Sequence, residues 1–267
     1  MTSPKRTRRV QTIDAPPRAK SPLTVKSVEK AFRMLDAFDP SRPVMGLTQL
    51  AAVLDIDKSE AQRFAHTLTE LGYLRKDPVT RSLQLTVKAL GLAHSFLRTN
   101  SVLRVASAYL THLNKLTEET VNLAMLDDTD IVIVQRIVSR HVFNENVVIG
   151  ARLPAFCTAA GRAILARLDE DAALDILKRS PLKPYTSTTV WRSADLLAQL
   201  QHAAKQGYAV TNGEFYSDIS VGAAVVDARG APVAAVSVSA SSAMVSAEDA
   251  ERRFAALVME ASRSISA

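Results

Sequence analysis

The feature that most constrains this chain is a change of hydrophobic period at Gly72. Before Gly72, apolar residues recur at helical spacing in three short segments; after it, they alternate with polar residues. The alternating runs 73–76 and 82–85 flank the turn pair Asp77-Pro78, which predicts a β-hairpin. Three helices followed by a hairpin are typical of a winged helix-turn-helix, and we expect this fold over residues 23–85.

Proline, capping residues and glycine set the expected ends of the three helices. The first is expected from Ser27 to a point before Pro40, because proline disfavours helix at the preceding residue. The second is expected at Thr48–Leu54 with Thr48 as N-cap. The third is expected at Asp57–Leu71, with Asp57 and Glu60 in capping-box spacing and Gly72 as its stop. The inward positions expected in the first two helices are Val28, Phe32, Leu35, Phe38, Leu50, Ala51 and Leu54.

The third expected helix separates into two faces. Its apolar side consists of Ala61, Phe64, Leu68 and Leu71, and its polar side consists of Lys58, Ser59, Gln62, Arg63 and His66. The polar side contains residue types that reach base edges and phosphates, with two basic residues near the helix start. A solvated helix face has the same pattern, but two preceding helices and a following hairpin favour a DNA-reading helix.

The charge distribution agrees with nucleic-acid contact by the first part of the chain. Residues 1–22 hold six basic side chains against Asp14, for a net charge of +5, and contain four prolines and no apolar period. Residues 23–98 have a net charge of +3 and residues 99–267 a net charge of −2. We expect residues 1–22 to be a disordered basic arm that contacts phosphates. The alternative is a non-specific nucleic-acid binder driven by this arm, recognised by affinity that depends on salt and not on sequence.

The second half of the chain predicts an α+β domain. A helix at Thr86–Arg98 would link it to the first domain, with 86–100 as the linker and 101–267 as the second domain. Helices are expected at Val102–Leu116, Thr158–Leu168, Glu170–Lys178, Ala194–Gln206 and from Ala247. Strands are expected at Val121–Leu126, Ile131–Val138, Val142–Ile149, Tyr208–Thr211, Ile219–Asp227 and Pro232–Ser239. Strands in two groups of three, separated by helices, favour a sheet sensor over a doubly wound nucleotide fold.

Several function classes are disfavoured by the sequence. A single cysteine, Cys157, leaves no internal disulfide and no multi-cysteine zinc site, so we expect no cofactor and no metal. No apolar run is long enough to span a membrane and the first residues have no secretion-signal core, so we expect a cytoplasmic protein. An enzyme using Cys157 with His141 or His202 as base is the remaining alternative. No spacing links these residues, and no phosphate loop or nucleophile elbow occurs.

A candidate ligand site combines a helix start with same-face serines. Thr158 opens an apolar-patterned helix, and the backbone N–H groups of Ala159, Ala160 and Gly161 are expected to be free donors there. Ser237 and Ser239 are two residues apart on a strand, so both hydroxyls lie on one face. We expect the helix start and the serines to bind a carboxylated ligand, unless the serines bond to neighbouring backbone or water.

Five separated motifs follow one another along residues 25–267. They are the opening helix Val25-Lys26-Ser27-Val28-Glu29-Lys30-Ala31, the run Glu70-Leu71-Gly72-Tyr73-Leu74, the segment Gly150-Ala151-Arg152-Leu153-Pro154, the helix Ala159–Ala166 and the strand Ala234–Ser239. With these motifs in this order, the chain resembles the IclR family of transcriptional regulators. Pro154-Ala155 with Gly161-Arg162 is similar to the branch that regulates aromatic-acid breakdown. Four positions depart from the family. Glu60 stands where Thr is frequent, and Arg81 stands where the wing usually turns on Gly. Ser217 and Ala224 replace the usual Gly and Pro in the second domain.

The resemblance implies a fold, partners and site residues. It implies a winged helix-turn-helix followed by an α+β, GAF-like domain with an antiparallel sheet that binds an effector. It implies a homodimer or homotetramer on a palindromic or pseudo-palindromic operator, controlled by a small organic acid that is carboxylic and could be aromatic. The residues expected to contact DNA are Thr48, Gln49, Lys58, Ser59, Gln62, Arg63, Arg75 and Arg81. The residues expected to contact the effector are Leu153, Thr158, Ala159, Ala160, Gly161, Ser220, Ser237 and Ser239.

Overall fold

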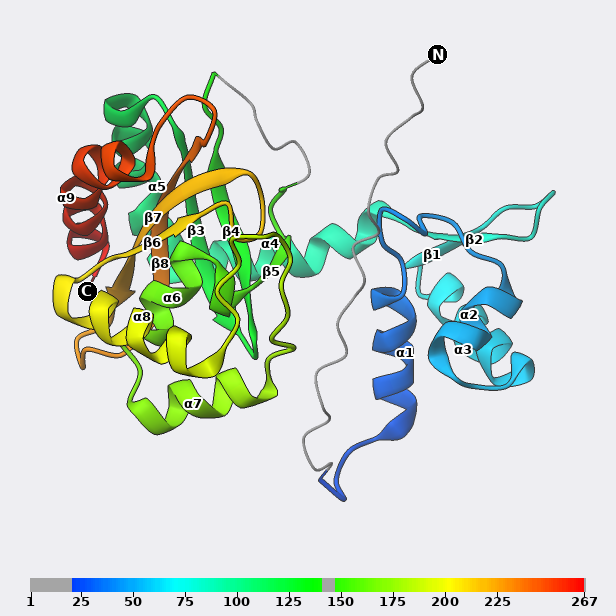
Figure 1. Ribbon diagram of the computed structural model, residues 1–267. Helices are drawn as coiled ribbons and strands as arrows, with labels where there is room; N and C mark the ends of the chain where they lie inside the picture. Colours follow the sequence, from blue (N-terminus) through cyan, green and yellow to red (C-terminus); the bar gives the residue numbers. More distant parts are fainter. Residues whose placement is uncertain (1–20, 141–146, 267) are drawn as a thin grey trace, which may run out of the picture. The chain divides into compact units, whose positions relative to one another are not determined.

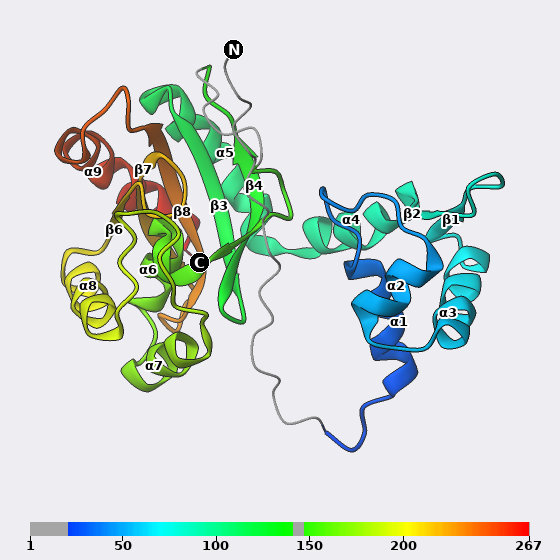
Figure 2. The ribbon, with the colours of Figure 1, turned by 45° about the vertical axis from the view of Figure 1, so that its right-hand side comes forward.

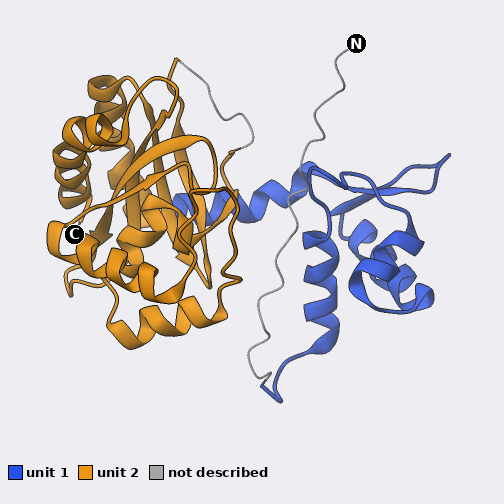
Figure 3. Ribbon diagram, viewed as in Figure 1, with its two compact units in different colours: residues 1–99 blue, residues 100–267 orange. Residues whose placement is uncertain are grey.

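The computed structural model describes residues 21–140 and 147–266 and divides into two compact units. Unit 1 ends at Thr99 and unit 2 begins at Asn100 (Figure 3). The basic arm predicted at 1–22 falls outside the described residues except for its last two positions. The strand predicted at Val142–Ile149 also falls largely outside them, and its described part, 147–149, is not a strand.

Unit 1 has the predicted order of three helices and a two-stranded hairpin. The elements are α1 (Lys26–Asp36), α2 (Leu47–Leu54), α3 (Lys58–Glu70), β1 (Leu74–Lys76) and β2 (Leu83–Leu85) (Figure 1). Met34, Leu50, Leu68, Leu74 and Leu83 meet in one buried core, so each helix and both strands contribute to it. Gly72 follows α3 with φ of +77°, the left-handed conformation that favours glycine after a helix.

Two of the predicted inward faces in unit 1 are wrong in part. In α1, Val28 and Phe32 are 52% and 54% exposed, and Met34 is the fully buried residue. The reason is that the apolar residues of α1 divide over two faces, and the face with Met34 packs on α2 and α3. Leu71 is 51% exposed because it follows the last residue of α3 as its C-cap.

The predicted linker helix begins as a single 3-10 turn. Thr86 caps this turn, η1 (Val87–Ala89), by accepting a hydrogen bond from the Lys88 N–H, and α4 (Leu90–Thr99) follows directly. Val87 and Leu90 are exposed at 81% and 65%, so neither side chain is buried in the core of unit 1.

Unit 2 is a six-stranded antiparallel sheet covered by helices on both faces. The strand order is β5-β4-β3-β8-β7-β6. The strands are β3 (Thr120–Asp127), β4 (Asp130–Ile137), β5 (Arg152–Pro154), β6 (Ala209–Asn212), β7 (Asp218–Val226) and β8 (Pro232–Ser241). The helices are α5 (Ser101–Thr117), α6 (Ala159–Leu165), α7 (Glu170–Arg179), α8 (Ser193–Gln206) and α9 (Ala247–Ile265). In Figures 1 and 2, α5 and α9 cover one face, and α6, α7 and α8 lie on the other.

The register of the central strands brings separated polar residues onto the α6 face. Ser237 lies opposite Asn122 of β3, and Ser239 lies opposite Ser220 of β7. The neighbours of these residues along β8, Val236 and Val238, are buried on the other face. The α+β antiparallel fold expected from the sequence is thereby confirmed, with β5 in place of the strand expected at Val142–Ile149.

Candidate functional site

The exposed face of α3 is the first candidate site. Asp57 caps the helix by accepting a hydrogen bond from the Glu60 N–H at 2.8 Å. Ala61, Ala65 and Leu68 are buried in the core of unit 1, and Phe64 is half-buried against it. The exposed residues on the opposite side are Lys58, Ser59, Gln62, Arg63 and His66. The helix therefore has one face held by its own unit and one polar face open to a partner.

The carboxylate of Glu60 does not complete the predicted capping box. It accepts a hydrogen bond from Lys30 Nζ of α1 at 2.7 Å instead, in a partly exposed ion pair. Lys30 lies near the middle of α1 and Glu60 in the first turn of α3, so the pair joins two helices of unit 1. Pairing with Lys30 also offsets the negative charge of Glu60 at the start of α3.

The start of α2 differs from the prediction by its capping residue. Gly46, not Thr48, is the N-cap, and its N–H donates to Gln49 Oε1 at 2.9 Å. The Gln49 amide reaches back over the first turn, and the helix consequently begins at Leu47. Thr48 and Gln49 are both exposed at this end of α2. In a helix-turn-helix this is the helix that crosses the DNA backbone.

The wing turn is organised by Asp77. Its carboxylate accepts hydrogen bonds from the N–H groups of Thr80, at 2.7 Å, and Val79, at 2.9 Å, and these bonds lower the pKa of Asp77. Arg81 then adopts φ of +62°, so the left-handed position usually occupied by glycine is here occupied by arginine. Arg81 at the turn and Arg75 on β1 are both exposed.

Unit 2 contains the second candidate site, a cavity of about 60 Å³ between the sheet and the start of α6. The residues predicted for the effector that line it are Leu153, Thr158, Ala159, Ala160, Ser220, Ser237 and Ser239. Gly161 is not among the lining residues. The structure thus brings most of the predicted residues to one cavity, although they come from four separate segments of the chain.

Gly161 has a packing role that the prediction missed. Its N–H is already bonded to Thr158 Oγ1 at 3.3 Å, so it is not a free donor for a ligand. A Cβ at this position would lie 2.2 Å from the carbonyl oxygen of Ala155. Glycine is required because the backbone of α6 passes directly over the turn that precedes it.

Gly222 of β7 allows a second close approach to the same helix. A Cβ there would lie 2.8 Å from the carbonyl carbon of Ala159 and 2.9 Å from the Ala160 nitrogen. The sheet and the first residues of α6 are therefore in backbone contact at the cavity edge. This contact places the start of α6 beside the serines of β7 and β8.

The serine hydroxyls lie in a hydrogen-bonded chain with residues that were not predicted. Ser220 Oγ donates to Asp218 Oδ2 at 2.6 Å and lies 2.6 Å from Ser239 Oγ. Asn122 Nδ2 donates to Ser239 Oγ at 3.5 Å, and Arg136 Nη1 donates to Asn122 Oδ1 at 2.8 Å. A polar side chain inside an apolar strand was the available signal for Asn122 and Arg136. No local pattern marked Asp218, at the first position of β7.

Burial shifts the pKa values of the two ionisable residues in this hydrogen-bonded chain, Asp218 and Arg136. Burial raises the pKa of Asp218, although the hydrogen bond from Ser220 and the charge of Arg136 oppose the increase. Burial likewise lowers the pKa of the Arg136 guanidinium, and the charge of Asp218 opposes that change. Among the described residues that line the cavity, Arg136 is the only one with a cationic side chain.

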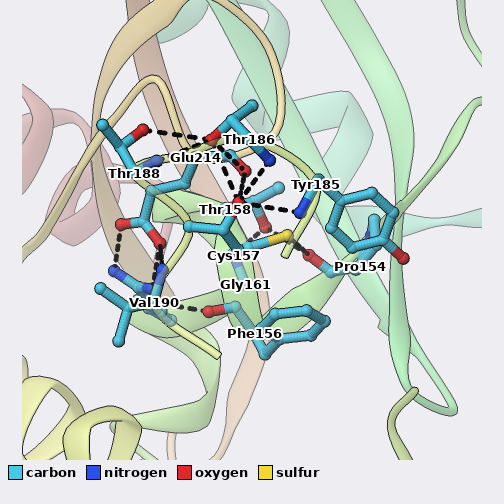
Figure 4. Close-up of polar contacts among 12 residues, drawn as sticks. Pro154, Phe156, Cys157, Thr158, Gly161, Tyr185, Thr186, Thr188, Val190 and Glu214 are labelled. Carbon is cyan, nitrogen blue, oxygen red and sulfur yellow. Dashed lines mark hydrogen bonds and ion pairs between the residues drawn. The ribbon is translucent and has the colours of Figure 1, made fainter. Parts of the chain in front are cut away.

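Glu214, which lines the cavity, takes part in a buried ion pair, and Figure 4 shows Glu214 with the contacts it accepts. Arg162 of α6 donates to both carboxylate oxygens of Glu214, at 2.7 and 2.6 Å, and its Nε donates to the Phe156 carbonyl at 2.8 Å. Glu214 Oε2 also accepts from the Val190 N–H at 2.9 Å. Because Arg162 and Val190 occupy its oxygens, Glu214 holds α6 and the 185–190 segment against the segment that follows β6.

Cys157 lies beside the cavity but has the wrong environment for a nucleophile. Burial raises the pKa of its thiol, whereas a reactive cysteine needs a lowered pKa. His202 is exposed on α8, and His141 lies outside the described residues. Within residues 21–140 and 147–266, no cluster of His, Cys, Asp and Glu could hold a metal ion. In the same ranges, no helix has both the length and the apolar character for crossing a bilayer.

A winged helix-turn-helix joined to an α+β unit with a polar cavity defines a ligand-binding transcriptional regulator. Residues 27–78 match the IclR helix-turn-helix domain, and residues 94–267 match the domain described as Bacterial transcriptional regulator IclR C-terminal. The chain belongs to the IclR family of transcriptional regulators, with a helix-turn-helix DNA-binding domain and a C-terminal ligand-binding domain.

Known proteins similar to this chain include regulators and a ligand complex. The Pca regulon regulatory protein of Pseudomonas putida is 29% identical over 91% of this chain and 84% of its own length. The regulator KdgR of Dickeya chrysanthemi is 32% identical over 92% of this chain and 81% of its own length. An IclR homolog of Microbacterium hydrocarbonoxydans, complexed with 4-hydroxybenzoate, shares the fold with a TM-score of 0.75. It is 20% identical, and the match covers 90% of this chain and 97% of that chain.

Proposed function

We propose that this regulator binds a specific operator as a dimer and that a small carboxylic acid in the cavity of unit 2 controls this binding. The observation that carries the proposal is the presence of two unlike polar surfaces. The exposed face of α3 suits a nucleic acid, and the cavity beside α6 suits a small molecule. Because the operator lies on the chromosome, the proposal requires a cytoplasmic protein.

Sequence-specific contact is assigned to the exposed polar residues of unit 1. Gln62 and Arg63 would read base edges in the major groove, and Lys58 and Ser59 would contact phosphates near the helix start. Thr48 and Gln49 at the start of α2, with Arg75 and Arg81 on the wing, would add backbone contacts. A non-specific binder would differ by keeping the same affinity on unrelated DNA, with a steep dependence on salt.

A dimer is supported by an exposed apolar stripe on α1. Val25, Val28 and Phe32 recur at helical spacing and are 52 to 60% exposed. Contiguous exposed apolar side chains mark interaction surfaces, and one short recognition helix reads too few base pairs to define an operator alone. Phe32→Asp should therefore convert the dimer to a monomer in sedimentation velocity. The same measurement on the parent shows whether dimers pair into tetramers.

The size of the cavity favours a short aliphatic acid. Its volume is about 60 Å³, whereas an engineered cavity that binds benzene measures about 150 Å³. The Ala159 and Ala160 N–H groups at the helix start and the charge of Arg136 would hold the carboxylate. Binding would then bias the placement of the DNA-reading units through α4, by favouring one of two arrangements.

An aromatic acid is the second candidate effector. Phe215 and Tyr216 line the cavity and could stack on a ring. The IclR homolog with the same fold was crystallised with 4-hydroxybenzoate. An aromatic ligand would require the cavity to enlarge, so its binding should be slower than that of a short acid.

A thermal-shift screen tests the proposal directly. A ligand that binds the folded protein raises its unfolding midpoint. We expect short aliphatic acids to raise the midpoint of the full-length protein and to change its affinity for an operator selected from random DNA. An acid that shifts the midpoint but leaves operator binding unchanged would contradict the regulatory role. Recovery of the acid chemically unaltered separates this role from an enzyme that uses Cys157.

A further inference from the structure

One wall of the cavity is built from three side chains that are linked by successive hydrogen bonds. Ser239, Ser220 and Asp218 are joined by hydrogen bonds of 2.6 Å each, and we call these three residues the acceptor wall. The wall is extended by Asn122 and Arg136 on β3 and β4. All five residues line the cavity, and Ser220 and Ser239 are buried.

The direction of the hydrogen bonds in the wall is set at its Asp218 end. Ser220 Oγ donates its single hydroxyl proton to Asp218 Oδ2. Ser220 must then accept from Ser239, which uses the single proton of Ser239. Asn122 in turn donates its amide to Ser239. Each hydroxyl proton of the wall is therefore engaged, and only lone pairs face the cavity.

We propose that the effector carries, besides its carboxylate, a hydrogen-bond donor that binds to the acceptor wall at Asp218. This assignment rests on the proposed function, because it describes the ligand of the same cavity. A hydroxyl or an amine satisfies the wall, whereas a carboxylate or a keto oxygen would face lone pairs and a negative charge. Asp218 thus determines which small acids the cavity binds.

The inference changes the role of the serines. Ser220 and Ser239 orient the acceptors and do not hold a carboxylate oxygen. Ser237 differs from them, because its hydroxyl has no hydrogen-bond partner among the residues that the structure describes. Ser237 lines the cavity two residues before Ser239 on β8, and its hydroxyl is free to donate to the ligand's acid group.

Matched three-carbon acids test the inference on the full-length protein. Calorimetry would compare lactate and alanine, which add a donor, with propionate, pyruvate and malonate, which do not. We expect lactate or alanine to bind about ten- to a hundredfold more tightly than propionate or pyruvate, because one hydrogen bond to a charged group is at stake. Lactate against alanine distinguishes a hydroxyl from an amine. Malonate should bind most weakly.

Two variants reverse parts of the wall. Asp218→Asn places an amide that can donate at the same position, so the preference should shift toward pyruvate and malonate. Ser220→Ala leaves the Ser239 proton without its acceptor, so pyruvate should gain affinity in this second, independent variant as well. Asp171→Asn, an exposed carboxylate on α7, is the matched control and should keep the parent's preference.

The outcomes separate the two levels of the proposal. If none of the five acids binds, the small-acid function is overturned together with the role of Asp218. If the acids bind with equal affinity, or Asp218→Asn keeps the parent's preference, only the role of Asp218 is overturned. A donor preference that both variants weaken and the control retains supports it.

Discussion

The two candidate sites differ in how the chain builds them. The DNA-reading face of α3 consists of residues within one helix, and its exposure follows from the helical period alone. The acceptor wall joins β7 and β8, and its extension reaches Asn122, which is 117 positions from Ser239. The first site depends on local structure, whereas the second exists only when the whole sheet has its register. Mutations that disturb packing should therefore affect the two sites very differently.

The largest expected contrast is between two ion pairs, one in each unit. Arg162 and Glu214 are 1% and 6% exposed, so Arg162→Met leaves a buried carboxylate without its partner and should cost about 3–5 kcal/mol. Lys30 and Glu60 are 29% and 22% exposed, and Lys30→Met should cost below about 1 kcal/mol. Denaturant unfolding of both variants measures the difference. Equal costs would show that burial does not separate these pairs.

A second contrast uses two helical glycines. Gly161→Ala places a methyl group 2.2 Å from the Ala155 carbonyl oxygen, and we expect a loss of about 3 kcal/mol with loss of ligand binding. A Cβ on Gly91 of α4 meets nothing within 4 Å, so Gly91→Ala should stabilise the helix by about 1 kcal/mol. Thermal unfolding checks both signs. A parent-like midpoint for Gly161→Ala would mean that α6 and its preceding turn can separate at little cost.

The same distinction explains how much of the fold could be predicted from sequence. Periods, caps and turn residues predicted the three helices, the hairpin and most elements of unit 2. They failed where tertiary packing chooses between faces, as in α1, whose Phe32 is exposed while Met34 is buried. They also failed at Thr48, because the Gln49 side chain competes for the cap. The strand predicted at Val142–Ile149 was also misplaced, because the strand found there, β5, is short and begins only at Arg152.

The candidate cavity could be predicted only where one segment carried a signal. The start of α6 and the alternate serines of β8 are local patterns, and family resemblance connected them. Asn122, Arg136 and Asp218 are single polar residues on different strands. Their meeting depends on strand order and register, which no short pattern specifies. Gly161 shows the reverse case, since a residue in the right motif serves packing instead of contact.

Mutation of the local site should change recognition without changing the fold. Arg63→Ala should weaken operator binding by about 1–3 kcal/mol and relax the preference at one base pair. Glu70→Ala, at the exposed end of the same helix, is the control and should leave the preference intact. Footprints on the selected operator measure both. If Arg63→Ala and Lys58→Ala leave the footprint unchanged, α3 is not the reading helix.

The smallest expected effect is a pH dependence of opposite sign in the two units. In unit 1, burial alone would raise the pKa of Asp39, but hydrogen bonds from Ser41 and Arg42 lower it to about 2. Its carboxylate therefore stabilises the fold above the unfolded value of 3.8, and this contribution is lost as the pH falls toward 2. In unit 2, burial raises the pKa of Asp218, so ionising its carboxyl group costs more free energy in the folded state than in the unfolded state. The protonated Asp218 therefore contributes to folding stability below pH 3.8, its unfolded pKa. This contribution is lost as the pH rises through the higher pKa of the folded state.

Asparagine variants convert this difference into a measurement, because the amide does not titrate. Asp39→Asn should lower the unfolding midpoint at pH 7, by the equivalent of less than about 1 kcal/mol, and the deficit should vanish near pH 2. Asp218→Asn should raise the midpoint at pH 7 relative to the parent, and this gain should shrink as the pH falls below 3.8. The groups facing Asp218, namely Arg136, Tyr216 and Ser220, keep their charge or neutrality across this range, so they add no slope of their own. Parallel pH profiles for the two variants would show that Asp218 in the cavity wall titrates like Asp39 in its turn. The contrast between the two units would then not extend to the electrostatics of these carboxylates.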